Sequence, residues 1–399
     1  MKPPHGNALI GQSGGPTCVI NQSLVGIVEA ALAAKSIGKV YGALHGIKGV
    51  LEGKLVDLGQ ESKATLEAVA RTPCAALRSV RKKPTREECE QALAAFKKHD
   101  VRYFFYIGGN DSAETAHVLN ELAVAEGYDV RLFHVPKTID NDLRGNDHCP
   151  GYGSAARFVA QAVMGDNLDN RSLPGIKIDI VMGRHAGWLT AASTLARIHP
   201  DDGPHLVYVP ERVFTLERFL ADVERVYKQH GRCLVAASEG IHGADGKTLV
   251  ESKEKDSHGN VQLSGSGALG DLLADEIKKN LGAKLRVRAD TFGYLQRSFP
   301  GVVSPVDAKE ARAVGRAAVR LATGTKHAHG SVAILRAPEG PYKVTFAHTE
   351  LRNVAKETRP MEPELLKGDS DVDARFLDYV RPLVGELPPV ARLSDFRIG

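Results

Sequence analysis

The sequence lacks the features that would place it among secreted, zinc-binding or membrane proteins. Its five cysteines are an odd number, lie far apart and form no C-x-x-C pair, which argues against a disulfide framework or a zinc cluster and is typical of reduced cytosolic thiols. No apolar run is long enough to span a membrane, and the first residues lack the apolar segment of a signal peptide. We therefore expect a soluble, cytoplasmic protein without a membrane partner.

Excess charge of one sign is also missing. Lys and Arg total 52 and Asp and Glu total 48, so the formal net charge is only +4 over 399 residues. No dense run of Lys and Arg is interleaved with aromatic residues, which argues against nucleic acid as a partner and favours small substrates. The apolar content of 43% is ordinary, and the length suggests two globular domains, or three.

Short apolar runs alternate with amphipathic segments along most of the chain, which is the pattern of a parallel sheet covered by helices. We expect strands at residues 8–12, 101–108, 130–135, 176–182, 205–209, 233–238 and 331–335. We expect helices at residues 22–35, 86–99, 113–126, 155–167, 188–197, 216–229, 269–280 and 305–323. The fold class is therefore α/β, with two sheets expected rather than one.

Two segments interrupt this alternation. Residues 242–266 are polar and rich in Gly, Ser, Lys and Asp, which favours a surface excursion over a functional lid. From Gly368 the pattern is mixed and ends in a Pro-rich stretch at residues 387–389. We expect this tail to pack as a cap on the domains.

Glycine is the residue present in modest excess, and the first notable turn is 11–16, Gly-Gln-Ser-Gly-Gly-Pro, between a strand and a helix. Backbone amides at such a turn, together with the helix dipole, suit a phosphate. The turn lacks the G-K-[ST] of a Walker loop but matches G-x-S-x-G, the nucleophile elbow of hydrolases, with Ser13 as nucleophile. No earlier strand is available to supply the second oxyanion donor, so phosphate binding is favoured, and an ordinary turn stays open.

Two further turns at strand ends carry polar side chains. Residues 107–112, Ile-Gly-Gly-Asn-Asp-Ser, follow an apolar strand, where open α/β sheets bind ligands, although Asp111 is equally suited to cap the next helix. Residues 136–142, Pro-Lys-Thr-Ile-Asp-Asn-Asp, combine a lysine and acids without helical or strand periodicity, which indicates a site.

The remaining candidates lie later in the chain. Two turns, 182–188 and 238–240, follow strands, and the cluster 286–297 adds cations and a tyrosine; each alone is equally well explained as a loop with incidental charge. Residues 151–156 fit G-x-G-x-x-A but follow no buried strand, so we interpret them as a helix start. His185 is expected to have a positioning role. Together, five strand-end turns and a basic cluster make coincidence a poor explanation.

Taken in order, these residues resemble the phosphofructokinase family, and more closely its pyrophosphate-dependent branch. The motifs are Gly14-Gly15, a basic stretch ending at Arg81, Gly108 to Asp111, Thr138 to Asp142, Met182-Gly183-Arg184, Glu239, and Arg288 to Arg297. The resemblance implies two Rossmann-like three-layer domains with mostly parallel sheets. It also implies a phosphoryl-donor domain at residues 1–151 and about 298–345, a sugar-phosphate domain at 152–297 with the insertion 242–266, and a C-terminal cap at 346–399.

The resemblance also assigns roles to individual residues. Asp140 would take the proton from the 1-hydroxyl of fructose 6-phosphate, and Gly14, Gly15 and Arg81 would hold the phosphoryl donor. The remaining sugar-phosphate contacts would come from Thr138, Met182, Gly183, Arg184, Glu239, Tyr294 and Arg297. Arg288 would reach the site of a neighbouring subunit, which implies a homodimer, or a tetramer.

The donor is indicated by two positions at which the ATP-using members of the family carry glycine, namely Asp111 and Lys137. Two like charges about 4 Å apart at an effective dielectric near 20 repel by about 4 kcal/mol, so Asp111 opposes the α-phosphate of ATP. Lys137 would neutralise charge developing on pyrophosphate. The expected reaction is reversible, gives fructose 1,6-bisphosphate and phosphate in glycolysis or gluconeogenesis, and uses Mg²⁺ as cofactor.

Three departures from the family pattern accompany this assignment. Asn110 stands where many members have an aspartate associated with Mg²⁺, and its amide oxygen still suits this cation. Arg78 replaces a turn glycine, and no arginine near Lys177 matches a second subunit-crossing arginine of the ATP-using enzymes. Three alternatives stay open: an ATP-dependent phosphofructokinase, a non-catalytic regulatory subunit of the same fold, and a serine hydrolase built on Ser13.

Overall fold

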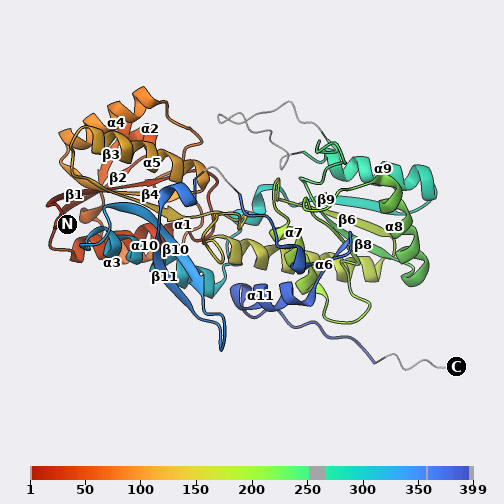
Figure 1. Cartoon of the computed structure of the whole chain (residues 1–399). Coiled ribbons are helices and arrows are strands. Elements are labelled where there is room, and N and C mark those ends of the chain that lie inside the picture. Colours follow the sequence, from red (N-terminus) through yellow and green to blue (C-terminus); the bar gives the residue numbers. More distant parts are fainter. Residues whose placement is uncertain (1, 251–265, 356–357, 395–399) are drawn as a thin grey trace.

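The computed structural model describes residues 2–250, 266–355 and 358–394, and these residues form two large sheets at opposite ends of the molecule (Figure 1). The first sheet has seven strands in the order β11-β10-β5-β4-β1-β2-β3 and the second has four in the order β7-β8-β6-β9. The strands of the first sheet are β1 (Gly6–Gln12), β2 (Ile37–Ala43), β3 (Leu55–Asp57), β4 (Val101–Gly108), β5 (Arg131–Pro136), β10 (His329–Arg336) and β11 (Val344–Thr349). Those of the second are β6 (Ile176–Val181), β7 (Leu206–Tyr208), β8 (Cys233–Ser238) and β9 (Val287–Thr291).

The strands are mostly parallel. In the first sheet only the outermost pairs, β2 with β3 and β10 with β11, are antiparallel, and all pairs in the second sheet are parallel. Parallel strands need crossover connections, and helices supply most of them. The expected α/β class with two mostly parallel sheets is therefore confirmed.

Helices cover both faces of each sheet, which gives each domain three layers. On the first sheet, α1 (Ile20–Ala33), α3 (Lys63–Ala70) and α10 (Pro305–Ala322) bury apolar residues on one face, and α2 (Ile47–Leu51), α4 (Arg86–Lys98) and α5 (Asn110–Ala125) on the other. On the second sheet, α6 (Tyr152–Ser172), α7 (Trp188–Ala192) and α11 (Ala374–Val384) oppose α8 (Leu216–His230) and α9 (Ala268–Leu281). Because helices cover both faces of each sheet, the loops that follow the strands remain uncovered at the sheet edges, and these edges face each other between the domains.

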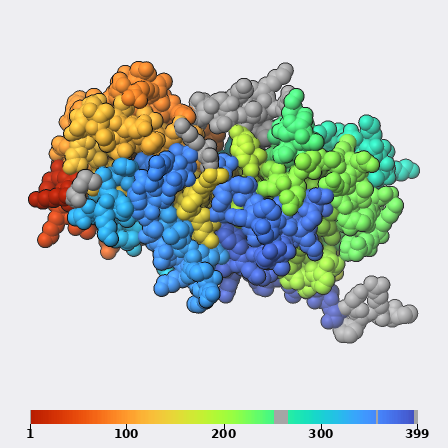
Figure 2. Space-filling view, in the orientation of Figure 1, coloured from red at the N-terminus to blue at the C-terminus, as the bar shows by residue number. Residues whose placement is uncertain are grey.

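The chain crosses between the sheets twice before the C-terminal segment joins them. α6 leads into the second sheet, and α10, β10 and β11 return to the first. α11 contacts both α6 and α10, and a small hairpin of β12 (Leu366–Lys367) and β13 (Asp371–Val372) precedes it. Figure 2 shows blue residues between the orange and yellow residues of the first domain and the green residues of the second. The domain boundaries given above stay a prediction.

The expected strands and helices are all present, with ends shifted by a few residues, and one helix is shorter than predicted. Instead of a helix over 188–197, α7 ends at Ala192 and a 3₁₀ turn (Ser193–Ala196) follows. The hydroxyls of Ser193 and Thr194 donate hydrogen bonds to backbone carbonyls three residues earlier, which competes with the α-helical pattern.

The elements that the sequence did not predict are short or have mixed polarity. β2 contains two glycines, and β9 reads Val-Arg-Ala-Asp-Thr, so neither shows an apolar run. α2 has five residues and α3 has eight, and α11 lies in the segment expected only to be a cap. Most of the polar stretch 242–266 lies outside the described residues. In the part of the chain that the structure covers, every helix is too short or too polar to cross a membrane.

Candidate active site

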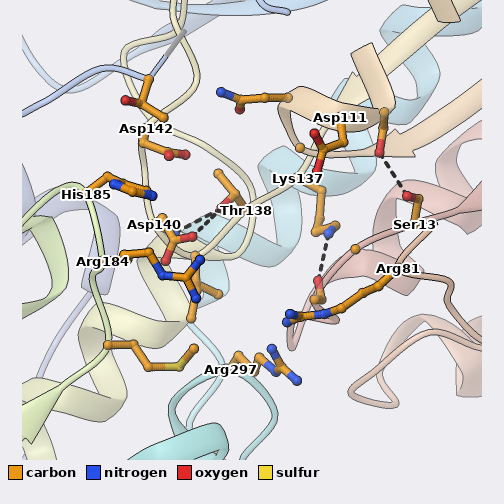
Figure 3. A pocket seen from close by; sticks show the side chains of 18 of the residues that line it. Ser13, Arg81, Asp111, Lys137, Thr138, Asp140, Asp142, Arg184, His185 and Arg297 are labelled. Carbon is orange, nitrogen blue, oxygen red and sulfur yellow. Dashed lines mark hydrogen bonds between the residues drawn. The ribbon is translucent and has the colours of Figure 1, made fainter. Parts of the chain in front are cut away.

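A cavity of about 580 Å³ lies where the carboxyl ends of strands from both sheets meet. The turns after β1, β4 and β5 approach from the first sheet, and those after β6 and β8 from the second. The cavity is lined by these predicted site residues: Gly14, Gly15, Arg81, Asn110, Asp111, Lys137, Thr138, Asp140, Met182, Arg184, Glu239, Tyr294 and Arg297. Figure 3 shows many of these side chains directed into one space. The five strand-end turns therefore do converge.

The glycine turn after β1 lets side chains approach its backbone. Gly14 has φ +75°, the left-handed region that favours glycine. A Cβ on Gly15 would lie 2.9 Å from a guanidinium nitrogen of Arg297 and 3.7 Å from one of Arg81. Because Gly15 has no side chain, both guanidinium groups can stand next to the turn, and the three groups together suit an anion.

Lys137 connects this turn to the loop after β5. Its Nζ donates a hydrogen bond of 2.7 Å to the carbonyl oxygen of Gly15, and the residue is only 2% exposed. Burial, reinforced by the charges of Arg297 and Arg81 and opposed by Asp140, lowers the pKa of Lys137 to about 7. The ammonium is thus held in a place where a bound anion would restore its full charge.

Asp140 lies three residues further along the same loop. Its backbone N–H donates to the Thr138 hydroxyl at 3.1 Å, and that hydroxyl in turn lies 3.5 Å from the Asp140 carboxylate. Burial raises the pKa of Asp140, while Lys137, His185 and other cations oppose the rise. A carboxylate with a raised pKa is suited to accept a proton near neutral pH.

Asp142 is a second partly buried carboxyl, two residues after the first. Burial and the charge of Asp140 raise the pKa of Asp142 to about 7. The residue between them, Asn141, has φ +59°; its side chain donates to the Tyr379 hydroxyl at 2.8 Å and accepts from the Cys149 backbone N–H at 3.0 Å. These two contacts fix the loop so that both carboxyls reach the cavity.

Asn141 lies in the predicted site turn 136–142, but its contact with Tyr379, on α11, was not predicted from the sequence. The signal available was weak, because Asn is a common loop residue and Tyr379 is 238 positions away. The sequence also gave no indication that Lys83, Glu114 and Thr358 line the cavity. His185 does line it, and its expected positioning role stays a prediction.

Two predicted residues do not line the cavity. Gly183 has φ +145°, and a Cβ there would come within 2.6 Å of the Ala186 carbonyl oxygen, so this glycine shapes the turn that carries Met182 and Arg184. Arg288 lies on the edge strand β9 and forms an ion pair of 2.7 Å with Asp169. Its expected role in a neighbouring subunit stays a prediction.

Close to Arg288 lies an acidic group that Lys177 partly neutralises. Asp166, Asp179 and Asp290 come together there, and the Lys177 ammonium contacts Asp166 at 3.4 Å and also Asp290. Lys177 is thus engaged within its own chain.

Arg78 shows why a turn glycine was expected at its position. Its φ is +61°, which costs a residue with a side chain on the order of 1 kcal/mol or more. The guanidinium contacts the His45 ring at 3.4 Å, and Arg78 is not among the cavity-lining residues. The structure therefore favours a local change in the turn, and not an added cation in the donor site, as the effect of Arg78.

The serine-hydrolase alternative finds no support in the surroundings of Ser13. Its hydroxyl accepts a hydrogen bond of 3.0 Å from Ser112 instead of pairing with a histidine. The residue is 6% exposed and is part of the glycine turn. Ser13 therefore supports the turn and is a poor candidate for a nucleophile.

The burial of Lys137 should make stability depend on pH. Its pKa is about 7 in the folded chain and close to 10.5 when unfolded. Between these values the unfolded chain binds a proton that the folded chain does not, so the free energy of unfolding should rise with pH. Thermal denaturation should show the native protein gaining stability relative to Lys137→Met as the pH rises above about 7. A difference that stays constant with pH would contradict the lowered pKa.

Comparisons with known proteins agree with this geometry. The chain matches the family model described as phosphofructokinase over residues 7–322. A pyrophosphate–fructose 6-phosphate 1-phosphotransferase of Rhodospirillum rubrum is 51% identical, with 98% of each chain covered. One from Xanthomonas campestris is 40% identical, with 98% of this chain and 94% of the relative covered. A pyrophosphate-dependent phosphofructokinase of Marinobacter aquaeolei has a TM-score of 0.85 at 34% identity, covering 97% of this chain and 94% of that one.

Proposed function

This chain belongs to the phosphofructokinase family, and on that premise we propose that it transfers a phosphoryl group from pyrophosphate to the 1-hydroxyl of fructose 6-phosphate. The products are fructose 1,6-bisphosphate and phosphate. The observation that carries the proposal is the hydrogen bond from Lys137 to the Gly15 carbonyl, which fixes a buried cation between the glycine turn and Asp140. The names of the similar proteins support the same reaction.

The reaction begins with Asp140. Its carboxylate accepts the proton of the sugar 1-hydroxyl while that oxygen forms a bond to the nearer phosphorus of pyrophosphate. The bond from this phosphorus to the bridging oxygen breaks, and phosphate leaves. Because burial raises the pKa of Asp140, the carboxyl is a stronger base than an exposed aspartate. In the reverse direction the protonated Asp140 returns the proton.

The donor is held by the glycine turn and two cations. Gly14 and Gly15 offer backbone at close range, and Arg81 and Lys137 supply positive charge around Gly15. Phosphoryl transfer depends mainly on positioning and charge stabilisation, which these groups provide. Asp111, in the first turn of α5, places a carboxylate in the same cavity and disfavours the extra phosphate of a nucleotide.

The residues present fit Mg²⁺, which we propose as the cofactor. Asp140, Asp142 and Asp111 offer carboxylate oxygens and Asn110 an amide oxygen, and all four line the cavity; oxygen ligands of this kind are what Mg²⁺ prefers. When bound, the ion neutralises charge on the donor phosphates. The pKa of Asp142 is raised because the carboxylate has too little positive charge near it, and a bound cation would supply that charge.

The sugar phosphate takes the side of the cavity formed by the second domain. Met182, Arg184 and Glu239 come from the turns after β6 and β8, and the hydroxyl of Thr138 faces them from the first domain. Tyr294 and Arg297 stand on the 3₁₀ turn after β9, with the guanidinium 4.6 Å from the centre of the tyrosine ring. This stacking positions a cation and a hydroxyl for the 6-phosphate.

We propose that the working enzyme is at least a homodimer in which Arg288 completes the sugar-phosphate site of its neighbour. Arg288 is on an edge strand and outside the cavity of its own chain. Mixing Asp140→Asn subunits with Arg288→Ala subunits, each nearly inactive alone, should restore activity. One site of each mixed dimer then has both native residues. Mixtures that stay inactive after subunit exchange has been confirmed would contradict the shared site.

A coupled assay with fructose 6-phosphate and Mg²⁺ tests the proposed function. Turnover with pyrophosphate and not with ATP is expected. Turnover with ATP alone would favour an ATP-dependent enzyme, and none with either donor would favour a regulatory subunit. We place the reaction in glycolysis and gluconeogenesis in the cytoplasm, since its reversibility suits both directions.

A further inference from the structure

An ion pair lines the donor side of the cavity and has no role in the site as described above. Lys83 precedes α4, Glu114 lies in the second turn of α5, and both face the cavity. Their charged atoms are 2.7 Å apart, with the lysine side chain 54% exposed and the glutamate side chain 16% exposed. The more exposed Lys83 therefore lies at the opening of the cavity, and the less exposed Glu114 lies deeper in its lining.

Glu114 adds a second negative charge to the end of the cavity that already carries Asp111. The two residues are three apart on α5, so they lie on the same face of the helix, and both line the cavity. Two carboxylates there would repel an anionic donor, and Lys83 supplies a cation that compensates for one of them.

Lys83 is able to exchange partners. An ion pair with an exposed lysine contributes little, about 0–1 kcal/mol, so separating it has a small cost. A phosphate carries more charge than a carboxylate and offers several oxygens to an ammonium. Lys83 follows Arg81 by two residues and contacts Glu114 on α5, the helix that also carries Asp111, and all four residues line the cavity. Lys83 thus lies on the donor side of the cavity.

We propose that Lys83 binds the leaving phosphate of pyrophosphate and that Glu114 positions Lys83 for it. This inference rests on the function proposed above, which it extends by one binding residue and one positioning residue. The Lys83–Glu114 pair also shortens the donor site, since a nucleotide would have to extend past both Asp111 and Glu114. The expected donor class is an inorganic diphosphate.

The neighbouring residue Lys82 provides a matched control. It carries the same charge, forms a comparable ion pair with Glu88, and does not line the cavity. A general loss of positive charge near the site would affect Lys82→Ala and Lys83→Ala alike. A contact with the donor would affect Lys83→Ala alone.

Steady-state kinetics of the full-length enzyme test the proposal. Lys83→Ala should raise KM for pyrophosphate roughly tenfold or more, as expected for loss of a charge-assisted hydrogen bond. KM for fructose 6-phosphate should stay within about twofold. Adding Glu114→Ala to Lys83→Ala should recover part of the loss, because the uncompensated carboxylate is removed as well. Lys82→Ala should resemble the native enzyme.

Several results would overturn the proposal. One is a KM for pyrophosphate that is the same in Lys83→Ala and Lys82→Ala, and another is an equal rise in KM for both substrates, which would indicate a structural role. If Lys83→Ala does not fold, Lys83→Gln takes its place, and stabilisation by pyrophosphate in thermal denaturation gives a second measure of donor affinity. Native enzyme that does not turn over with pyrophosphate refutes the proposed function instead.

Discussion

Replacing Asp140 by asparagine is expected to lower kcat by a factor on the order of 10² to 10⁴ in both directions of the reaction. The amide has nearly the same shape as the carboxylate but cannot accept the proton of the sugar hydroxyl. Because the amide has the shape of the carboxylate and can keep the contact with the Thr138 hydroxyl, the change should leave the site's shape intact. Initial rates with saturating pyrophosphate and with saturating phosphate measure the effect.

The control for this variant is substrate binding. Asp140→Asn should still be stabilised by pyrophosphate and by fructose 6-phosphate in thermal denaturation, since the guanidinium groups of Arg81 and Arg297 are unchanged. The native enzyme should lose kcat as the pH falls below the raised pKa of Asp140, because the carboxyl is then protonated. The residual activity of Asp140→Asn should lack this dependence. A variant that keeps most of the native kcat would refute Asp140 as the base.

Replacing both Asp111 and Lys137 by glycine is expected to lower kcat with pyrophosphate on the order of a hundredfold or more. Loss of the Lys137 ammonium removes a buried cation that would stabilise charge on the transferred group, and removal of one such donor has an effect of this size in other enzymes. The same change removes the Asp111 carboxylate that opposes a nucleotide. The coupled assay with each donor measures both consequences.

Single variants separate the two contributions. Asp111→Gly alone should weaken the exclusion of ATP, visible as competitive inhibition by ATP against pyrophosphate. Lys137→Gly alone should carry most of the loss with pyrophosphate. An unchanged pyrophosphate rate in the double variant would contradict the role of Lys137, and an unchanged response to ATP would contradict the role of Asp111.

Most of the regular structure was predictable because its signal is local. An apolar run such as residues 233–238 becomes a buried parallel strand, and its ends were predicted without error. β9 was missed because Arg288 and Asp290 interrupt its apolar pattern. These charges are accommodated by Asp169 on α6 and by Lys177 on β6, which a local pattern does not reveal.

The candidate site was predictable in its parts and not in its connections. Glycine and charged residues mark the strand-end turns in the sequence, so Gly14, Lys137 and Asp140 could be identified as candidates from their own segments. The hydrogen bond from Asn141 to Tyr379 and the ion pair between Lys83 and Glu114 join segments that are separated in the chain. No local pattern distinguishes any of these residues within its own segment, so its role is visible only from the contact with its partner.

The sequence by itself determined which side chains stand at the ends of the strands, because strand periodicity and glycine turns depend on neighbouring residues. The resemblance to the phosphofructokinase family, and not the periodicity, predicted that Asp111 and Lys137 lie on the donor side. Only the tertiary structure decided how those groups behave. Packing around Lys137 removes its water and brings Arg297 and Arg81 close, which lowers its pKa to about 7. Packing of the whole fold decides how far a side chain is removed from water and which charges lie near it. The sequence decides only which titratable side chains are present.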